Sequence, residues 1–200
     1  MGRSDLDPTF SRRRKIIGVM GSGVDEHVEL ATVAGSTIAA LGHHLLTGGG
    51  GGVMRSVSQA YAGSSKRQGV VLGVIRAETE SSAAGRMPVR SYSPLGTPNE
   101  WVDIPVFTHL PHSAELGKEP TSRNHINVLT SDVVVALPGG PGTRTEVELA
   151  LEYGWPLVFF DGGLKIDGRP PSELAVGRPL VREAANAQDL AACITELLGQ

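Results

Sequence analysis

Three glycine clusters, each set between a strand-length apolar run and a helical stretch, constrain the fold of this chain more than any other feature. The clusters are Gly21–Gly23, Gly48–Gly52 and Pro138–Gly142. A strand that passes through glycines into a helix leaves backbone N–H groups free at the positive end of the helix dipole, and such groups bind anions. The chain therefore contains the same kind of potential anion site three times.

The apolar pattern between the clusters alternates between short runs typical of buried parallel strands and the spacing of amphipathic helices. Strands are expected at Ile16–Met20, His44–Thr47, Val70–Ile75, Val102–Phe107, Val133–Leu137 and Leu157–Phe160. Helices are expected at Glu26–Leu41, Val53–Ala62, Ser122–Thr130, Thr143–Tyr153 and Ala187–Leu198. This alternation predicts an α/β fold with a single-domain Rossmann-like architecture, a doubly wound parallel sheet flanked by helices.

The segments outside these elements are expected to be loops or tails. Residues 1–14 are polar and basic without periodicity, and they are expected to form a flexible N-terminal arm before one domain at residues 15–200. Ala77–Glu100 and Gly162–Arg178 hold most of the remaining Pro, Gly and Ser residues, which is typical of loops.

Charge and composition exclude several classes of function. The chain has 18 basic and 21 acidic residues and a net charge of −3, so nucleic acid is not an expected partner. Its one cysteine, Cys193, excludes an internal disulfide and a cysteine-based metal site. The apolar runs are too short to span a membrane, and the basic arm lacks the apolar core of a signal peptide. We expect a cytoplasmic protein with a small-molecule ligand.

The first two glycine clusters do not match the common nucleotide-binding motifs. Gly21-Ser22-Gly23 has a carboxylate where a dinucleotide fingerprint has its third glycine, and no acidic residue ends the second strand. Gly48–Gly52 lacks the Lys-Ser or Lys-Thr of a nucleoside-triphosphate loop. The run could bind a phosphate group, or it could be a turn that lets the following helix pack close to the sheet.

The third cluster is the most specific motif. Residues 138–146 read PGGPGTRTE, which resembles the P-G-G-x-G-T-x-x-E motif of the Lonely Guy (LOG) superfamily, formerly labelled lysine decarboxylase-like. Ser122-Arg123-Asn124 lies where that family carries its arginine, and Thr47–Met54 resembles its G-G-G-x-x-G-x-M motif. The resemblance covers most of residues 15–160.

The resemblance to the family's hydrolases implies a catalytic pair, Arg123 and Glu146, that cleaves the N-glycosidic bond of a nucleoside 5′-monophosphate. A carboxylate can stabilise a sugar cation or activate water, and an arginine can orient the sugar or the phosphate. The phosphate would lie against Gly139, Gly140, Gly142 and Thr143. The alternative is a purely structural role, in which Thr143-x-x-Glu146 is a capping box that satisfies the first N–H groups of its helix.

Other residues make the chain more similar to a different branch, the molybdenum cofactor carrier proteins. Asn124 replaces the lysine of the hydrolases, and Arg76 follows Gly73-Val74-Ile75 where they have a proline. Gly18–Gly21, Trp101–Pro105 and Ser122–Asn124 resemble the carrier branch. The resemblance implies a protein that binds and protects the molybdenum cofactor, a pterin with a terminal phosphate and an oxyanion-like metal centre.

Two hypotheses follow: a non-catalytic carrier, which we favour, and a nucleoside 5′-monophosphate phosphoribohydrolase. A lysine decarboxylase is disfavoured because Lys66 and Lys118 lie in polar, loop-like contexts.

Arg55 and Arg144, each just inside a helix after a glycine loop, could pair with a phosphate or could be solvated surface residues. The expected ligand-binding residues are Gly21, Ser22, Gly23, Gly49, Gly50, Gly51, Gly52, Met54, Arg55, Asn124, Gly139, Gly140, Gly142 and Thr143.

Three further expectations concern metals, a lid and assembly. His109-x-x-His112-x-x-Glu115 lies in an irregular segment and is interpreted as loop histidines, so no metal site is expected. The same segment, residues 109–120, could fold over a ligand as a lid. The family resemblance implies a homo-oligomer, a dimer or tetramer, and the apolar positions Val147–Leu151 cover more than one helix face, as burial against a partner would require.

Overall fold

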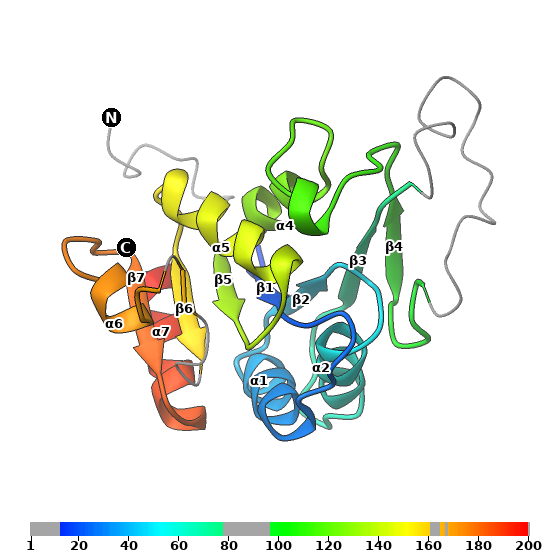
Figure 1. Cartoon of the computed structure of the whole chain (residues 1–200). Coiled ribbons are helices and arrows are strands. Elements are labelled where there is room, and N and C mark those ends of the chain that lie inside the picture. Colours follow the sequence, from blue (N-terminus) through cyan, green and yellow to red (C-terminus); the bar gives the residue numbers. More distant parts are fainter. Residues whose placement is uncertain (1–12, 78–96, 161–164, 167, 200) are drawn as a thin grey trace.

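The computed structural model describes residues 13–77, 97–160, 165–166 and 168–199, and these contain one sheet of seven parallel strands (Figure 1). The strand order is β4-β3-β2-β1-β5-β6-β7. The strands are β1 (Ile16–Met20), β2 (His44–Thr47), β3 (Val71–Ile75), β4 (Ile104–Phe107), β5 (Val133–Ala136), β6 (Leu157–Phe160) and β7 (Val181–Ala184). This confirms the predicted Rossmann-like α/β fold.

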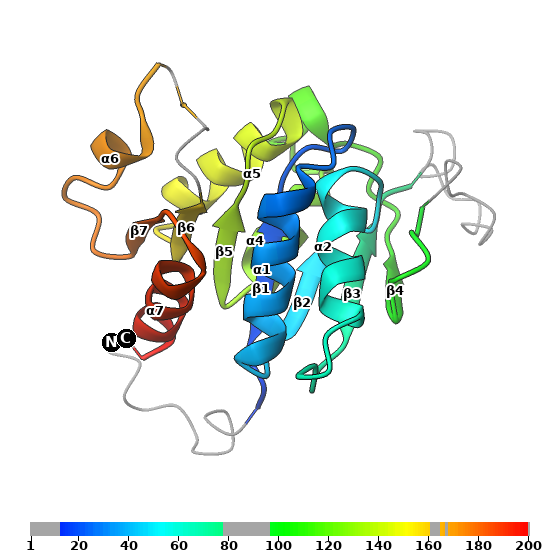
Figure 2. The same cartoon turned by 90° about the horizontal axis from the view of Figure 1, so that it is seen from below.

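Helices cover both faces of the sheet. On one face lie α1 (Val28–Ala40), α2 (Val53–Ala62) and α7 (Ala187–Leu198), seen in front of the strands in Figure 2. On the other lie α4 (Asn124–Thr130) and α5 (Pro141–Glu152), with the short helices η3 (Ala114–Leu116) and α6 (Pro171–Leu174). Within the described residues no helix is long and apolar enough to pass through a bilayer.

The central strand β1 is buried on both faces, which explains why its sequence is a continuous apolar run. Ile17 and Val19 pack with α1, α2 and α7, whereas Met20 packs in the cluster beneath α4 and α5. Gly18 is required for close packing, because a Cβ there would overlap the hydroxyl of Ser131. The core therefore consists of two layers, one on each side of the sheet.

The structure corrects the expected elements at the edges of the sheet. β4 is exposed at all four residues and not buried as predicted, because it is an edge strand; Ile104 is 46% exposed. The prediction missed β7, whose sequence VREA has charged residues at its two central positions and borders solvent on the other edge. The short helix α6 lies inside the segment predicted to be a loop.

Most of the predicted flexible arm lies outside the described residues, but its last two residues form hydrogen bonds. Arg13 pairs with Asp132, with 2.6 Å between Nη2 and Oδ1, and Asp132 also accepts the backbone N–H of Ile16 at 2.8 Å. Arg14 donates to the carbonyl oxygen of Gly42 at 3.0 Å. Arg13 and Arg14, the last two residues of the predicted arm, are therefore bonded to the domain.

The apolar residues of α5 that were expected to contact a partner subunit are buried within the single chain. Val147, Leu149 and Ala150 are each at most 2% exposed inside this single chain, and Leu151 packs against the same core cluster. Their burial against the sheet explains why apolar residues cover more than one face of the helix. A homo-oligomer stays a prediction from the family resemblance alone.

Candidate functional site

A cavity of about 300 Å³ lies at the carboxyl ends of β1, β2 and β5. The chain leaves β1 toward β2 on one side and returns as β5 on the other, so this is the position where the strand order reverses and where ligands bind in open α/β sheets. The cavity is lined by Val19, Met20, Gly21, Ser22, Gly23, Val24, Gly48, Met54, Ser113, Ala114, Arg123, Asn124, Gly140, Pro141, Gly142, Thr143 and Glu146.

The N-terminus of α5 provides free hydrogen-bond donors to this cavity. Gly140 is the N-cap, Pro141 is the first helical residue, and no side chain caps the helix, so the backbone N–H groups of Gly142 and Thr143 have no intrahelical partner. The side chain of Thr143 is also unsatisfied: the residue is 2% exposed, and its Oγ1 has no hydrogen-bond partner among the described residues. Buried hydroxyl groups without partners are rare, and they suggest a missing ligand or water.

The glycines before this helix have two different reasons to be glycine. A Cβ on Gly139 would overlap Thr143 Oγ1 and would lie 2.8 Å from the backbone nitrogen of Ser22, so Gly139 permits the first and third glycine loops to touch. A Cβ on Gly140 would meet nothing within 4 Å. The space beside Gly140 is therefore open, as a ligand site requires.

Glu146 lies at the inner wall of the cavity. It is 7% exposed, and its Oε1 accepts a hydrogen bond from Asn127 Nδ2 at 2.7 Å. Burial raises the pKa of Glu146 to about 7, against the opposing effects of the Asn127 hydrogen bond and the positive charge of Arg123. The capping-box alternative is wrong, because α5 starts at Pro141 and places Glu146 in its second turn, beyond the positions that a capping box uses.

Arg123 immediately precedes α4 and extends under the sheet's carboxyl edge. Its Nη1 donates to the carbonyl oxygens of Gly48 and Val74, the groups at the ends of β2 and β3, while its buried Nε has no partner. Burial lowers the pKa of Arg123 to about 10. Arg123 therefore bonds two strand ends and also lines the cavity.

The five-glycine run packs the chain and does not surround the cavity. Of its residues, only Gly48 lines the cavity. Gly49 and Gly52 have φ of +70° and +57°, and a Cβ on Gly52 would overlap the carbonyl oxygen of Ser22. This carbonyl accepts the N–H of Val53 at 2.9 Å, which joins the start of α2 to the first glycine loop. The structure thus favours the packing interpretation of Gly49, Gly50, Gly51 and Gly52.

The two arginines considered as phosphate ligands lie elsewhere. Arg55 does not line the cavity; it pairs with Glu100 at 2.5 Å and lies 3.9 Å from Glu26. Arg144 pairs with Glu148 at 2.8 Å on the outer face of α5. Arg123 is therefore the arginine that the structure brings to the cavity among the described residues.

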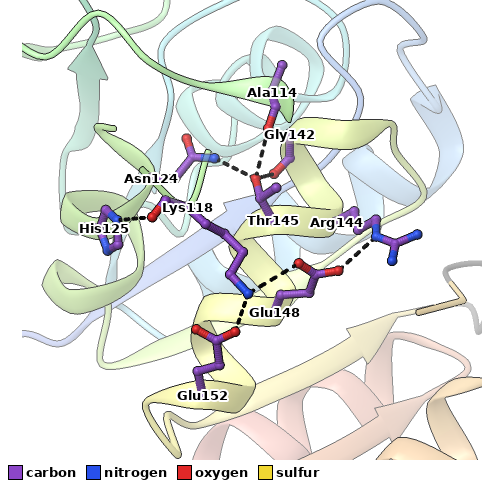
Figure 3. A network of polar contacts seen from close by, with 9 residues as sticks. All are labelled: Ala114, Lys118, Asn124, His125, Gly142, Arg144, Thr145, Glu148 and Glu152. Atoms are coloured by element: carbon purple, nitrogen blue, oxygen red, sulfur yellow. Dashed lines mark hydrogen bonds and ion pairs between the residues drawn. The ribbon is translucent and has the colours of Figure 1, made fainter. Parts of the chain in front are cut away.

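Residues 109–120 form part of the cavity wall, through Ser113 and Ala114. Figure 3 shows that Thr145 fastens this segment to α5: its Oγ1 lies 3.3 Å from the carbonyl oxygen of Ala114 and 2.8 Å from that of Gly142. Asn124 Nδ2 donates to the same Oγ1 at 2.9 Å. The segment is thus held over one side of the cavity by a buried hydroxyl group.

A second set of contacts holds the outer part of the segment (Figure 3). Lys118 Nζ lies 3.7 Å from a carboxylate oxygen of Glu148 and also pairs with Glu152. His125 Nε2 lies 3.2 Å from the carbonyl oxygen of Lys118. His112 lies against Thr121, with 2.8 Å between Nδ1 and Oγ1.

In the part of the chain that the structure describes, no group of three or more His, Cys, Asp or Glu side chains could hold a metal ion.

Comparison with known proteins identifies the family. A model of the SLOG cluster4 family matches residues 14–190. The chain belongs to the SLOG cluster4 family.

Two proteins with solved structures and one further sequence relative are similar to this SLOG cluster4 protein. The molybdenum cofactor binding protein of Rippkaea orientalis is 29% identical with a TM-score of 0.67, over 94% of this chain and 99% of that chain. The molybdenum cofactor carrier protein of Chlamydomonas reinhardtii is 29% identical with a TM-score of 0.65, over 94% and 100%. An uncharacterized protein of Archaeoglobus fulgidus is 29% identical over 76% of this chain and 83% of its own length.

Sequence reasoning missed several parts of the site in this SLOG cluster4 protein. Asn127 follows Arg123 by four residues and therefore shares its helix face, so the spacing could have suggested a contact with the same wall. Ser113 and Ala114 come from an irregular segment, and only their tertiary contacts with α5 place them at the cavity. Gly48, the first residue of the glycine run, is not among the expected ligand-binding residues, yet it lines the cavity.

Proposed function

We propose that this SLOG cluster4 protein is a carrier that binds a phosphorylated pterin of the molybdenum cofactor type and releases it unchanged. The observation that carries the proposal is the uncapped N-terminus of α5, where the backbone N–H groups of Gly142 and Thr143 and the unpartnered Thr143 hydroxyl meet at the cavity. Such a donor set fits a phosphate group. The similarity to molybdenum cofactor carrier and binding proteins supports the pterin as the rest of the ligand.

The residues of the cavity fit this ligand in two further respects. The open space beside Gly140 lies next to the donors, where the phosphate oxygens need room. Met20, Met54 and Val19 provide apolar surface in the same cavity, against which a flat ring can lie. The cofactor is cargo, so its redox chemistry belongs to the enzyme that receives it.

One observation favours the hydrolase as a second candidate. Glu146 is buried at the cavity with its pKa raised to about 7, and a carboxyl group with such a pKa can donate or accept a proton near neutral pH. In a carrier the same group would remain a hydrogen-bonding partner of the ligand. The two functions therefore differ in whether the ligand is cleaved.

The deciding experiment combines ligand binding with a test of turnover. We expect the purified protein to bind molybdopterin, measured by isothermal titration calorimetry, and Thr143→Val to weaken binding about tenfold through loss of a hydrogen bond to a charged group. Because Thr143 Oγ1 has no partner in the free protein, the variant should be at least as stable as the wild type. Thr195→Val, on the exposed surface of α7, is the matched control.

The same preparations are incubated with a panel of nucleoside 5′-monophosphates. No release of free base is expected from the wild type. Release that disappears in Glu146→Gln would replace the carrier with the hydrolase, and absence of molybdopterin binding would contradict the carrier directly.

A further inference from the structure

Arg76 follows the last residue of β3 and has no carboxylate partner among the described residues. The side chain is partly buried, and within the described residues its only hydrogen bond runs from Nη1 to the carbonyl oxygen of Pro111, at 3.5 Å. This distance is at the upper limit for a hydrogen bond. By contrast, the partly buried Arg67 is bonded to Asp103. In the part of the chain that the structure describes, Arg76 is therefore a half-buried guanidinium group without a counterion.

The position of Arg76 brings its charge next to Arg123. Side chains alternate along a strand, so Arg76 lies on the same face as Val74, which packs in the core cluster beneath α4 and α5. Arg123 reaches that point from the start of α4 and bonds the carbonyl oxygen of Val74. The positive charge of Arg76 contributes to the lowered pKa of Arg123.

The local charges do not balance. Among the described residues, Glu146 is the carboxylate whose charge acts on Arg123, and its own pKa is raised to about 7. Within the described residues, two guanidinium groups therefore lie near one acting carboxyl group, and burial disfavours the ionised form of that group. An anion bound between them would relieve this repulsion.

The size of the cavity indicates that such an anion would be one end of a larger ligand. At about 300 Å³ the cavity is at the lower end of the range for small-molecule sites, which is roughly 300–1,000 Å³. A ligand with a phosphate at α5 and a second anionic group at its other end would extend past it. Arg123 lines the cavity, and Arg76, which does not line it, lies beyond Arg123, two residues after the Val74 carbonyl that Arg123 bonds.

We propose that Arg76 and Arg123 form a second anion subsite, which holds an oxyanionic group at the end of the ligand opposite to its phosphate. The nature of that ligand rests on the proposed function, whereas the subsite itself requires only a tetrahedral oxyanion. The ligands that this protein retains are thus molecules with two separated anionic groups, and mononucleotides with a single phosphate satisfy only one of the two subsites.

The test is a calorimetric titration with molybdate as the probe, on the full chain and four variants. The wild type should bind two oxyanions, one at α5 and one at the arginine pair. Arg76→Gln should lose one of the two sites, Arg76→Lys should keep it with affinity reduced by less than about tenfold, and Thr143→Val should weaken the other. Arg178→Gln is the matched control, because within the described residues Arg178 also bonds only a backbone carbonyl oxygen, that of Leu174 at 2.7 Å, on the segment between α6 and β7.

The outcomes separate this inference from the proposed function. Unchanged stoichiometry and affinity in Arg76→Gln, or an equal loss in Arg178→Gln, would show that Arg76 binds no anion. A wild type that binds no oxyanion, or only one that Thr143→Val removes, would overturn the subsite equally. Molybdate binding that depends on Arg76, together with no binding of molybdopterin, would overturn the proposed function and leave the subsite in place.

Discussion

Asn127 donates a hydrogen bond from Nδ2 to Oε1 of Glu146 at 2.7 Å, and the two residues are only 1% and 7% exposed. This bond stabilises the ionised carboxylate and opposes the effect of burial on its pKa. Asn127→Ala should therefore raise the pKa of Glu146 from about 7 by about one unit or more, since a hydrogen bond to a charged group contributes about 1.5–3 kcal/mol. Carbon-detected NMR of the labelled carboxyl group measures this directly.

The neighbouring amide provides the control for that experiment. Asn124 lies on the same helix, but its Nδ2 donates to Thr145 and not to Glu146. Asn124→Ala should leave the pKa of Glu146 unchanged. Equal shifts in both variants would mean that general loosening of α4, and not the Asn127 bond, sets the pKa.

The stability of the protein should decrease as pH rises through the range set by Glu146. The pKa of its carboxyl is raised from the ordinary 4.5 to about 7, so ionisation is harder in the folded than in the unfolded chain. The unfolded state is then favoured progressively between pH 4.5 and 7, by at most roughly 3 kcal/mol at about 1.4 kcal/mol per pKa unit. Below pH 4.5 both states are protonated and the penalty vanishes.

Glu146→Gln removes this pH dependence. Urea denaturation at pH 4 and pH 8 should show the variant gaining stability relative to the wild type at the higher pH. Parallel curves for the two proteins across that range would contradict a raised pKa for Glu146.

Two glycine substitutions should have opposite effects on stability and binding. Gly52→Ala introduces a Cβ that overlaps the carbonyl oxygen of Ser22 at a φ of +57°, so it should lower the free energy of unfolding by more than about 1 kcal/mol. Gly140→Ala meets no atom within 4 Å, so stability should be preserved while the added methyl group occupies space at the cavity. Thermal unfolding and phosphate titration of both variants would measure these effects. Unchanged phosphate affinity in Gly140→Ala would place the anion elsewhere.

The Thr145 hydroxyl group should hold the segment around Ala114 in place. Thr145→Val removes the group that lies within hydrogen-bonding distance of Asn124 Nδ2 and of the carbonyl oxygens of Ala114 and Gly142. Because Asn124 is then left with an unsatisfied buried donor, we expect a loss of about 1–3 kcal/mol in stability. Hydrogen exchange should also become faster at the amide of Gly117, which donates to Ala114 in this segment. Thr195→Val, whose hydroxyl donates to the carbonyl oxygen of Ala191 on the exposed face of α7, should do neither.

The sequence correctly predicts the bounds of strands whose apolar pattern has a local cause. β1, β2 and β6 coincide with their expected ranges, because each is a buried apolar run bounded by loop residues. The edge strands could not be judged in the same way. β4 and β7 differ in sequence from the central strands, and whether a strand has a neighbour on one side or two depends on tertiary structure.

The site was predictable in its chemistry and less so in its geometry. Arg123, Glu146, Thr143 and Gly140 were expected from the motifs and lie together at the cavity. The glycine run Gly49–Gly52 misled because positive φ angles and phosphate binding both call for glycine. Arg55 was expected at the ligand site because its actual partner, Glu100, is distant in the sequence and could not be recognised there.

The pairing of the central strands has a consequence for the growing polypeptide. β1 gains its first neighbour, β2, early, but its other neighbour, β5, is made only when Val133 opposite Ile17 has been synthesised. A ribosome-bound chain that ends before this point contains the four strands from β4 to β1, yet it lacks α5 and every donor at the start of that helix. The hydrogen-bond donors at the start of α5 are therefore present only in chains whose translation has passed Thr143.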